Sequence, residues 1–418
     1  MSIHHNDPDS VVVIVGASHA GVQAADSLLA EGFTGRIEIF SDEAELPYQK
    51  PPLSKNLDAA PLSPLPLRAE SFFEDPRITL HRGARVATID RATQVVETTD
   101  GTRVRYAALI LATGTRPRTL PLPGHTSPGI HALRTVRDAT DVAEAMPHSD
   151  SAVVIGAGFI GLEFATVARR SGIDVAILAL EDRPMSRVVS PIMSSYFAHK
   201  HSGAGVQLRM GEAPESFLFE QGILSGVRGS SGTVYSANLA LVGIGVVPND
   251  ELAASCGLNV NNGIVVDEFL RTSDPAIYAI GDCANFPSLD GSLSRRVESV
   301  QNANDQARAV ARNIAGVPSP YQEVPWFWSV QAGVRLQIAG LAEGVVTTIT
   351  SGETESDSFS TLSFDQSGRL IAVESVNRSA DHLAARRLLK GGCGLTPEQA
   401  SAPGFNLKHY SQSRISVL

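Results

Sequence analysis

The chain has 418 residues, of which 43% are apolar and 19% are charged, and its formal net charge is −10. This length predicts two or three domains of ordinary globular composition, and the acidic balance argues against a nucleic-acid binder, whose affinity depends on neutralising phosphates. Three scattered cysteines, Cys256, Cys283 and Cys393, exclude a disulfide framework, and because no signal peptide or membrane-length apolar run occurs, we expect a cytoplasmic protein without a membrane partner.

The chain opens on a strand, a glycine turn and a helix, and this pattern recurs later. Residues 11–25 read VVVIVGASHAGVQAA, and residues 152–165 read AVVIGAGFIGLEFA. Each copy is the expected opening of a βαβ nucleotide-binding unit. Two such units in one chain predict two dinucleotides, and the usual pair that exchanges a hydride is a nicotinamide and a flavin.

The first glycine turn runs from Gly16 to Gly21 and reads G-x-S-x-x-G. Backbone amides at the start of the following helix, together with the helix dipole, favour a bound pyrophosphate. Ser18 stands where the middle glycine is usual, and its hydroxyl can donate to a phosphate. Asp42 follows the next predicted strand, where an acidic side chain accepts from a ribose hydroxyl. The alternative is a purely structural turn between a strand and a helix.

Further elements are predicted along the rest of the chain. In order they are a proline-rich loop at 46–66, a strand at 108–112 that ends in Thr113-Gly114, a linker at 116–128, the complete G-x-G-x-x-G at 156–161, a strand at 239–242 that ends in Gly243-Ile244-Gly245, a strand at 277–280 that ends in Gly281-Asp282, and a helix at 299–314. From 324 onward, alternating segments at 335–341 and 370–376 and a helical spacing at 381–390 predict a small α+β domain.

Several longer motifs make the sequence similar to the FAD-dependent ferredoxin reductases of oxygenase systems, the type that includes putidaredoxin, rubredoxin and aromatic dioxygenase reductases. These motifs are LPYQKPPLSK at 46–55, ATG at 112–114, GDCA at 281–284, RVESVQNA at 296–303, PWFWS at 325–329, VNR at 376–378 and DHLAARR at 381–387. The resemblance implies an α/β fold with two Rossmann-like domains, one inserted in the other, and a C-terminal α+β domain. The implied boundaries are 1–117 and 248–325 for the FAD domain, 118–247 for the NAD(P) domain and 326–418 for the last domain.

The resemblance also implies an activity. NAD(P)H gives a hydride to FAD, and single electrons then pass to a small [2Fe-2S] ferredoxin or rubredoxin that supplies a P450 or Rieske oxygenase. The related disulfide reductases need a C-x-x-C motif, which this sequence lacks. The alternative is a FAD-binding interaction protein similar to apoptosis-inducing factor, with slow or lost reduction by nicotinamide.

Two residues are expected to be catalytic. In the family, the lysine that matches Lys55 lies beside the flavin N5 and pairs with a glutamate that matches Glu163. A positive charge there favours the reduced, anionic flavin. The alternatives are a surface lysine and a glutamate in the first turn of a helix, stabilised by the dipole.

The other expected site residues bind the cofactors, and no metal is expected. For FAD they are Gly16, Ser18, His19, Ala20, Gly21, Asp42, Lys50, Lys55, Val86, Ala112, Thr113, Gly114, Arg134, Gly281, Asp282, Glu298, Ser299, Val300 and Trp328. For the nicotinamide they are Gly156, Gly158, Phe159, Ile160, Gly161, Glu163, Arg183, Arg187, Gly243, Ile244 and Gly245. Alternatives are a helix N-cap for Asp282 and a core tryptophan for Trp328, while Cys283 is expected to be a small buried side chain.

The sequence departs from the family at two positions. Ala179 stands where NADH-using relatives commonly carry a glutamate that binds the ribose and repels a 2′-phosphate. Glu181 and Asp182 lie close enough to substitute, and Arg183 and Arg187 lie close enough to bind a phosphate. NADH is therefore expected first, with NADPH as the alternative. Val330 replaces a common aspartate after the W-F-W-S segment.

Two groups of basic residues are candidates for steering an acidic partner. One is Arg295 and Arg296, near the flavin segment, and the other is Arg386, Arg387 and Lys390. The alternative for the second group is a helix C-terminus stabilised by cations. Charge reversal at Arg295 and Arg296 is expected to slow ferredoxin reduction and to leave dye reduction unchanged.

Overall fold

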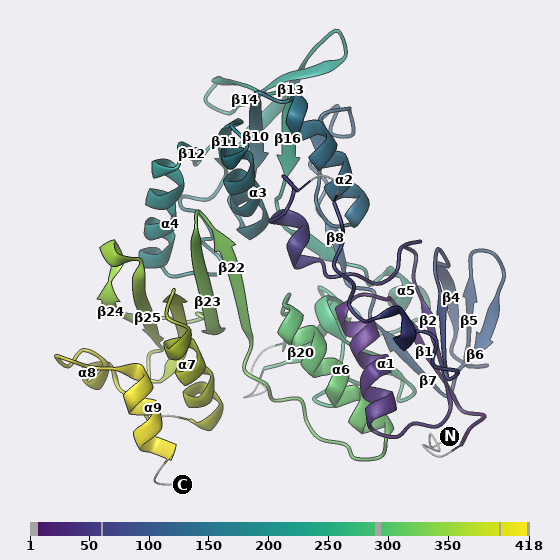
Figure 1. The fold of residues 1–418 in the computed structure, drawn as a ribbon. Coiled ribbons are helices and arrows are strands. Elements are labelled where there is room, and N and C mark those ends of the chain that lie inside the picture. The colour runs from purple at the N-terminus through teal and green to yellow at the C-terminus, as the bar shows by residue number, and fades with distance from the viewer. Residues whose placement is uncertain (1–6, 60–61, 289–293, 393, 416–418) are drawn as a thin grey trace. The chain divides into compact units, whose positions relative to one another are not determined.

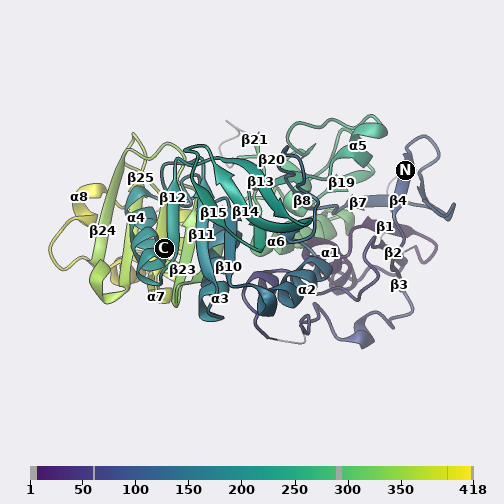
Figure 2. The same ribbon diagram turned by 90° about the horizontal axis from the view of Figure 1, so that it is seen from above.

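The protein was analysed as a computed structural model that describes residues 7–59, 62–288, 294–392 and 394–415 (Figures 1 and 2). Cys393 and the first six residues lie outside the described residues. The chain forms two units. Unit 1 holds the residues up to Gln49, Pro64–Arg116 and Val246–Glu323, and unit 2 holds Lys50–Ser63, Pro117–Gly245 and the residues from Val324 onward.

Unit 1 is built on a parallel sheet in the order β19-β7-β1-β2-β3. Its strands and helices are β1 (Val11–Val15), α1 (His19–Ala30), β2 (Arg36–Phe40), β3 (Ile78–His81), β4 (Val86–Asp90), β5 (Val95–Thr98), β6 (Arg103–Arg105), β7 (Ala108–Leu111), β8 (Thr115–Pro117), β17 (Val246–Pro248), α5 (Glu251–Ser255), β18 (Ile264–Val265), β19 (Ile277–Ala279), β20 (Ala284–Pro287), β21 (Ser294–Arg295) and α6 (Val300–Ile314). Every residue of β1 and β7 is buried, as expected for strands covered on both faces. Helices α1 and α6 lie side by side (Figures 1 and 2).

Unit 2 repeats this topology in a parallel sheet of order β12-β11-β10-β16-β9. Its first elements are β9 (Ile130–His131), α2 (Val136–Ala145), β10 (Ser151–Ile155), α3 (Phe159–Arg170), β11 (Asp174–Ala179), α4 (Pro191–Gly203), β12 (Gln207–Met210), β13 (Pro214–Glu220), β14 (Ile223–Gly229), β15 (Val234–Ser236) and β16 (Leu239–Val242). The order β16-β10-β11-β12 matches β7-β1-β2-β3 of unit 1. The internal repeat in the sequence is therefore a repeat of structure as well.

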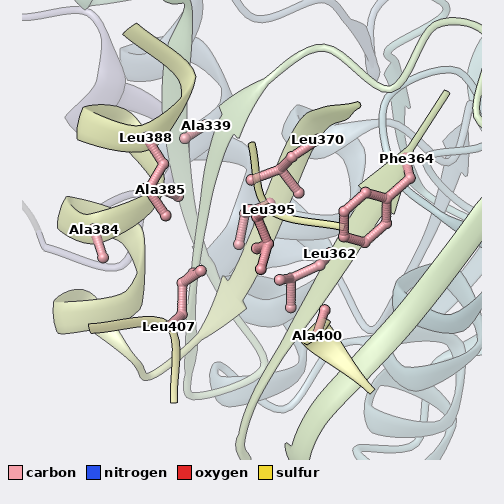
Figure 3. Close-up of a cluster of buried hydrophobic side chains, with 11 residues drawn as sticks. Ala339, Leu362, Phe364, Leu370, Ala384, Ala385, Leu388, Leu395, Ala400 and Leu407 are labelled. Carbon is pink, nitrogen blue, oxygen red and sulfur yellow. The ribbon is translucent and has the colours of Figure 1, made fainter. Parts of the chain in front are cut away.

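The rest of unit 2 is an antiparallel sheet in the order β22-β23-β26-β25-β24. Its elements are β22 (Trp326–Gln331), β23 (Val334–Gly340), β24 (Thr347–Glu353), β25 (Ser358–Phe364), β26 (Leu370–Val376), α7 (Ser379–Gly391), α8 (Pro397–Ala400) and α9 (Leu407–Ile415). Side chains of α7 such as Ala385 and Leu388 pack on Leu362 and Leu370 of the sheet (Figure 3). The expected α/β fold, with an additional C-terminal α+β region, is confirmed.

The division into units differs in two respects from the domain boundaries expected from sequence. Residues 50–63, assigned by sequence to the first part of the FAD domain, group with unit 2, and so do the residues after 324. The finer assignment of four segments to three domains stays a prediction.

Candidate functional site

The first glycine turn leaves space for nothing larger than glycine at its two ends. Gly16 follows β1 with φ +112°, and a Cβ atom there would lie 2.2 Å from the carbonyl oxygen of Ala112. A Cβ on Gly21 would lie 1.8 Å from the carbonyl oxygen of Gly16. These contacts explain both glycines, because α1 must start directly against the end of the strand.

The carboxyl ends of neighbouring parallel strands bring the other unit 1 motifs to the same edge of the sheet. The amide of Ala112, just past β7, donates to Val15 of β1 at 2.8 Å. Past β19, the amide of Gly281 donates to Oε1 of Gln306 in α6 at 2.7 Å. Thr113 and Gly114 continue from Ala112 along this edge. The edge thus combines three chain segments beside one helix N-terminus, which is where ligands bind in open α/β sheets.

The remaining predicted FAD residues of unit 1 lie on several elements. Asp42 is exposed just after β2, and Val86 is buried in β4. Ser299 caps α6 by accepting from the amide of Asn302 at 3.0 Å, and Val300 begins that helix. Asp282 is the second residue of a short 3₁₀ helix at 281–283. The alternative that it caps a helix is therefore wrong.

The helices that follow the two glycine turns begin without a side-chain cap. Neither Ser18 before α1 nor Gly158 before α3 makes a capping hydrogen bond, and neither helix has an acidic residue in its first turn. In contrast, Thr135, Ser190 and Ser299 accept from backbone amides of α2, α4 and α6. Uncapped amides at a helix N-terminus suit an anion. Both turns, with His19, Ala20, Phe159 and Ile160 in the first helical turns, therefore fit a dinucleotide pyrophosphate.

The second glycine turn has the same packing at its ends and open space at its centre. A Cβ on Gly156 would lie 2.4 Å from the carbonyl oxygen of Gly243, just past β16, and one on Gly161 would lie 2.5 Å from that of Gly156. A Cβ on Gly158 would have no atom of the described residues within 4 Å. The central position thus faces open space, as a turn that cradles a phosphate requires.

Three residues at the end of β11 and in the loop after it differ in how accessible they are to a nucleotide. Ala179 ends the strand and is 2% exposed. Arg183 donates to the carbonyl oxygens of Val189 at 3.0 Å and Ser186 at 2.8 Å, so it braces its own loop. Arg187 is exposed, and its Nη2 lies 3.8 Å from Oε1 of Glu181. A Cβ on Gly245 would lie 3.8 Å from that same nitrogen, which places Arg187 beside the Gly243-Ile244-Gly245 turn.

Lys55 and Glu163 form an ion pair in unit 2. Lys55 Nζ lies 2.8 Å from Oε2 of Glu163, and the two side chains are 23% and 5% exposed. The lysine also donates to the carbonyl oxygen of Pro51 at 3.0 Å. Glu163 lies past the first turn of α3 and is buried. The alternatives of a surface lysine and a first-turn glutamate are therefore wrong, because both groups are held by tertiary contacts.

Two serines that complete this cluster were missed among the site residues predicted from sequence. Ser54 Oγ donates to Oε2 of Glu163 at 2.5 Å, and Ser329 Oγ donates to Oε1 at 2.5 Å. Both lie inside motifs that carry the family resemblance, P-P-L-S-K and P-W-F-W-S. That placement was the available signal, but only the fold shows that both serines meet the same carboxylate.

The other predicted cofactor residues of unit 2 lie near these elements. The amide of Arg134 donates to Asp138 at 3.0 Å, just before α2, and Lys50 precedes the 3₁₀ helix at 51–54. Trp328 is partly buried in β22, with its ring 5.7 Å from that of Trp326. Their roles toward FAD stay predictions.

The basic residues proposed to steer a partner are partly used by the fold. The Arg296 side chain is only 8% exposed, pairs with Glu298 at 2.9 Å and donates to the carbonyl oxygen of Asp282 at 2.7 Å. It therefore cannot be a free surface charge. The Arg386 guanidinium lies over the ring of Trp326, 4.4 Å from its centroid. Arg387 is exposed.

Cys283 is fully buried, and this burial raises the pKa of its thiol. It is therefore an inert, small core side chain, as expected. Within the described parts of the chain, no group of three or more His, Cys, Asp or Glu residues is arranged to hold a metal ion. Among the described residues, no helix is both long and apolar enough to span a membrane.

Comparisons with known proteins agree with this arrangement. Residues 10–307 match the family model of pyridine nucleotide-disulphide oxidoreductases, and residues 326–411 match the reductase C-terminal model. The chain is 48% identical over 399 residues to rhodocoxin reductase of Rhodococcus erythropolis, covering 95% of this chain and 93% of that protein.

Two solved structures are also similar. The ferredoxin reductase for the CYP199A2 system from Rhodopseudomonas palustris has a TM-score of 0.93 and 44% identity, covering 96% of this chain and 100% of that one. The covalent putidaredoxin reductase–putidaredoxin complex has a TM-score of 0.93 and 35% identity, covering 97% and 99%. This chain therefore belongs to the pyridine nucleotide-disulphide oxidoreductase family, in the group of its ferredoxin reductases.

Proposed function

We propose that this protein is a FAD-dependent NAD(P)H reductase of a small [2Fe-2S] ferredoxin or rubredoxin, and that its partner supplies a P450 or Rieske oxygenase. The observation that carries this proposal is the pair of uncapped glycine turns, one in each unit, at the edge of two sheets with the same strand order. When bound, FAD supplies the chemistry of accepting a hydride and passing on its electrons one at a time.

In this proposal the residues of the chain bind the two dinucleotides and orient them. The amides around Ser18 hold the FAD pyrophosphate and those around Gly158 hold that of the nicotinamide. Asp42 accepts from the ribose of FAD. Lys55, fixed by Glu163 and by the carbonyl oxygen of Pro51, holds a positive charge in place. Because no bond to the protein need form, placement supplies most of the rate.

NADH is the proposed nucleotide. The loop after β11 offers Arg187 to a 2′-phosphate, but Glu181 lies beside it, and Arg183 already donates from both terminal nitrogens to backbone carbonyls. A phosphate would therefore meet one exposed cation next to a carboxylate. Because Ala179 supplies no carboxylate to the adenosine ribose, we expect the discrimination against NADPH to be modest.

A cytoplasmic location is part of the proposal. Cys256 and Cys283 are free thiols, as is usual in a reducing compartment. The proposed acceptor is a separate iron–sulfur protein, named by analogy with the redox partners of the related reductases.

Anaerobic stopped-flow mixing of the purified flavoprotein with NADH and with NADPH tests the proposal. We expect rapid bleaching of the flavin absorbance by NADH, slower bleaching by NADPH, and reoxidation on adding a [2Fe-2S] ferredoxin or a rubredoxin. Slow or absent bleaching by both nucleotides would contradict the proposal and favour a FAD-binding interaction protein. Fast bleaching without reoxidation by either acceptor would contradict the proposed partner class.

A further inference from the structure

Behind the Lys55–Glu163 ion pair lies a buried chain of hydrogen bonds that leads away from the lysine. Ser329 on β22, which donates to Glu163 of α3, also accepts from Nε2 of Gln331 at 3.2 Å. Oε1 of Gln331 in turn lies 2.8 Å from Nε2 of His201 on α4. Ser329 is 1% exposed, and Gln331 and His201 are 0% exposed. Four buried side chains from three elements, those of Glu163, Ser329, Gln331 and His201, thus form one hydrogen-bonded line.

The donor and acceptor properties of these groups allow the hydrogen bonds of the line to run in only one direction, from His201 to Glu163. The carbonyl oxygen of Gln331 only accepts, so Nε2 of His201 must carry a proton and donate it. The amide nitrogen of Gln331 donates to Ser329 and also lies 3.5 Å from the sulfur of Met185. The hydroxyl proton of Ser329 is then available only for Glu163. Every donor therefore points toward the carboxylate.

The far end of the line favours this direction as well. Nδ1 of His201 is buried and has no hydrogen-bond partner among the described residues. Burial lowers the pKa of His201, although its hydrogen bond to Gln331 opposes this. The imidazole is thus held neutral, with one proton on Nε2, and the line cannot reverse without leaving a buried donor unpaired.

We propose that Ser329, supported by Gln331 and His201, is a positioning residue for the reductase reaction: it fixes the Glu163 carboxylate so that Lys55 is held in one place. This inference rests on the proposed function and deepens it. With Ser54 and Lys55 on Oε2 and Ser329 on Oε1, both oxygens are held, so the carboxylate plane cannot rotate. Without Ser329, Oε1 is left buried and unpaired, and the carboxylate turns to share the remaining donors.

Ser329→Ala tests this proposal, and Ser360→Ala is its matched control. Ser360 lies in the same sheet, is also buried, and also donates to a carboxylate, that of Asp381 at 3.0 Å. The two variants thus lose the same atoms and a similar hydrogen bond, but only Ser329 contacts Glu163. Ser329→Thr keeps the hydroxyl and serves as the rescue. Gln331→Leu breaks the line one step further away, in case Ser329→Ala does not fold.

The first readout is flavin reduction by a series of NADH concentrations. We expect Ser329→Ala to lower the limiting rate about tenfold with a half-saturating concentration within about twofold of wild type. Ser329→Thr should recover most of the rate, and Ser360→Ala should keep it. Gln331→Leu should lie between the wild type and Ser329→Ala.

The second readout does not depend on turnover. Competitive acylation of lysines in the purified flavoprotein, read by mass spectrometry, compares Lys55 with Lys200, whose Nζ is held by Asp357 at 2.6 Å. The ratio of Lys55 to Lys200 labelling should rise several-fold in Ser329→Ala and stay unchanged in Ser360→Ala.

The outcomes separate the two proposals. A wild-type limiting rate and an unchanged labelling ratio in Ser329→Ala would overturn the positioning role, as would equal losses in Ser329→Ala and Ser360→Ala. If the wild type is reduced by neither nucleotide, the proposed function fails, and the labelling ratio still decides whether Ser329 fixes the ion pair.

Discussion

Buried polar side chains in unit 2 find partners that are far away in the sequence. Glu163 accepts from Ser54 and Ser329, and Glu374 accepts from Ser190 and Thr361. A buried carboxylate is costly unless it is fully hydrogen-bonded. These partners therefore satisfy the oxygens of both buried carboxylates, and at Glu163 they fix the group that pairs with Lys55.

His382 is a buried residue without such partners. Both of its ring nitrogens are buried and lack a hydrogen-bond partner among the described residues. Its ring packs edge-on against Trp326, with centroids 5.5 Å apart. Burial, with smaller contributions from Arg386 and Arg335, lowers the pKa of His382 from 6.5 to about 4.

This pKa predicts a loss of stability in acid. Between pH 6.5 and pH 4 the unfolded chain binds a proton that the folded chain does not, so the free energy of unfolding falls as the pH falls through this window. The loss attributable to His382 is up to about 3 kcal/mol. His382→Phe keeps the edge-on packing and should be less sensitive to acid than wild type.

Urea unfolding of both proteins at several pH values measures this difference. Near neutral pH His382 is uncharged in both states, so the comparison there reports packing alone. Parallel stability curves for the two proteins down to pH 4 would show that His382 does not titrate as described. Other buried histidines, such as His201, are the same in both proteins, so their contributions cancel in the difference between the two stability curves.

At the scale of elements, the glycine turns are the parts of the chain most strictly determined by local geometry. A Cβ at Gly16, Gly21, Gly156 or Gly161 would lie 2.5 Å or less from a backbone oxygen. The central positions differ, because the first turn contains Ser18 and the second faces open space at Gly158. The glycines at the ends of each turn are thus required for the strand and helix to pack closely, and the centre of the turn is available to a ligand.

This difference predicts that two alanine substitutions in the second turn affect different properties, one the stability of the fold and the other the affinity for NADH. Gly161→Ala places its Cβ 2.5 Å from a carbonyl oxygen and 2.9 Å from Val154, so it should lower the free energy of unfolding by about 1–3 kcal/mol. Gly158 has φ −84°, which alanine adopts freely. Gly158→Ala should keep its stability and bind NADH about tenfold more weakly, because its methyl group stands where a pyrophosphate approaches.

Thermal unfolding and equilibrium NADH titration of both variants separate these effects. The wild type and Gly158→Ala should unfold at the same temperature. Unchanged NADH affinity in a stable Gly158→Ala protein would mean that this turn does not hold the nucleotide.

At the scale of the whole molecule, buried polar contacts join the second nucleotide-binding region to the C-terminal sheet within unit 2. The amide and hydroxyl of Ser190, which caps α4, donate to Glu374 of β26 at 2.6 and 2.5 Å. Thr361 of β25 donates to the same carboxylate at 2.6 Å. Tyr196 and Lys200 of α4 bind Asp357. We therefore expect these two regions of unit 2 to unfold together.

Glu374→Ala tests this coupling. The variant leaves three buried donors without an acceptor, and we expect it to lose about 2–4 kcal/mol of stability. Burial raises the pKa of Glu374 in spite of its donors, so the neutral variant Glu374→Gln should lose less. Both tryptophans, Trp326 and Trp328, lie on β22, so their fluorescence follows the unfolding of this unit.

The expected result is a lower urea midpoint for tryptophan fluorescence in Glu374→Ala than in the wild type. An unchanged midpoint in Glu374→Ala would show that the contact contributes nothing to stability. Two separate transitions in the wild type would show that the regions unfold independently.

The amino-acid sequence by itself determined the two nucleotide-binding units. It also predicted the helix at 299–314 and the strands at 108–112, 239–242 and 277–280, which the structure has at Val300–Ile314, Ala108–Leu111, Leu239–Val242 and Ile277–Ala279. Glycine turns, strand runs and helix caps depend on backbone geometry within a few residues, so they can be recognised along the chain. The resemblance in the P-P-L-S-K and W-F-W-S motifs then indicated the reductase family.

Only the tertiary structure decided the environment of individual charges. It buried Arg296 against Asp282 and Glu298, used Arg183 to brace its own loop, and brought Ser54 and Ser329 to the two oxygens of Glu163. Ser54, Glu163 and Ser329 are more than 100 residues apart from one another in sequence. No local sequence pattern predicts this contact, because it depends on how α3 and β22 pack together and not on the neighbours of each serine along the chain.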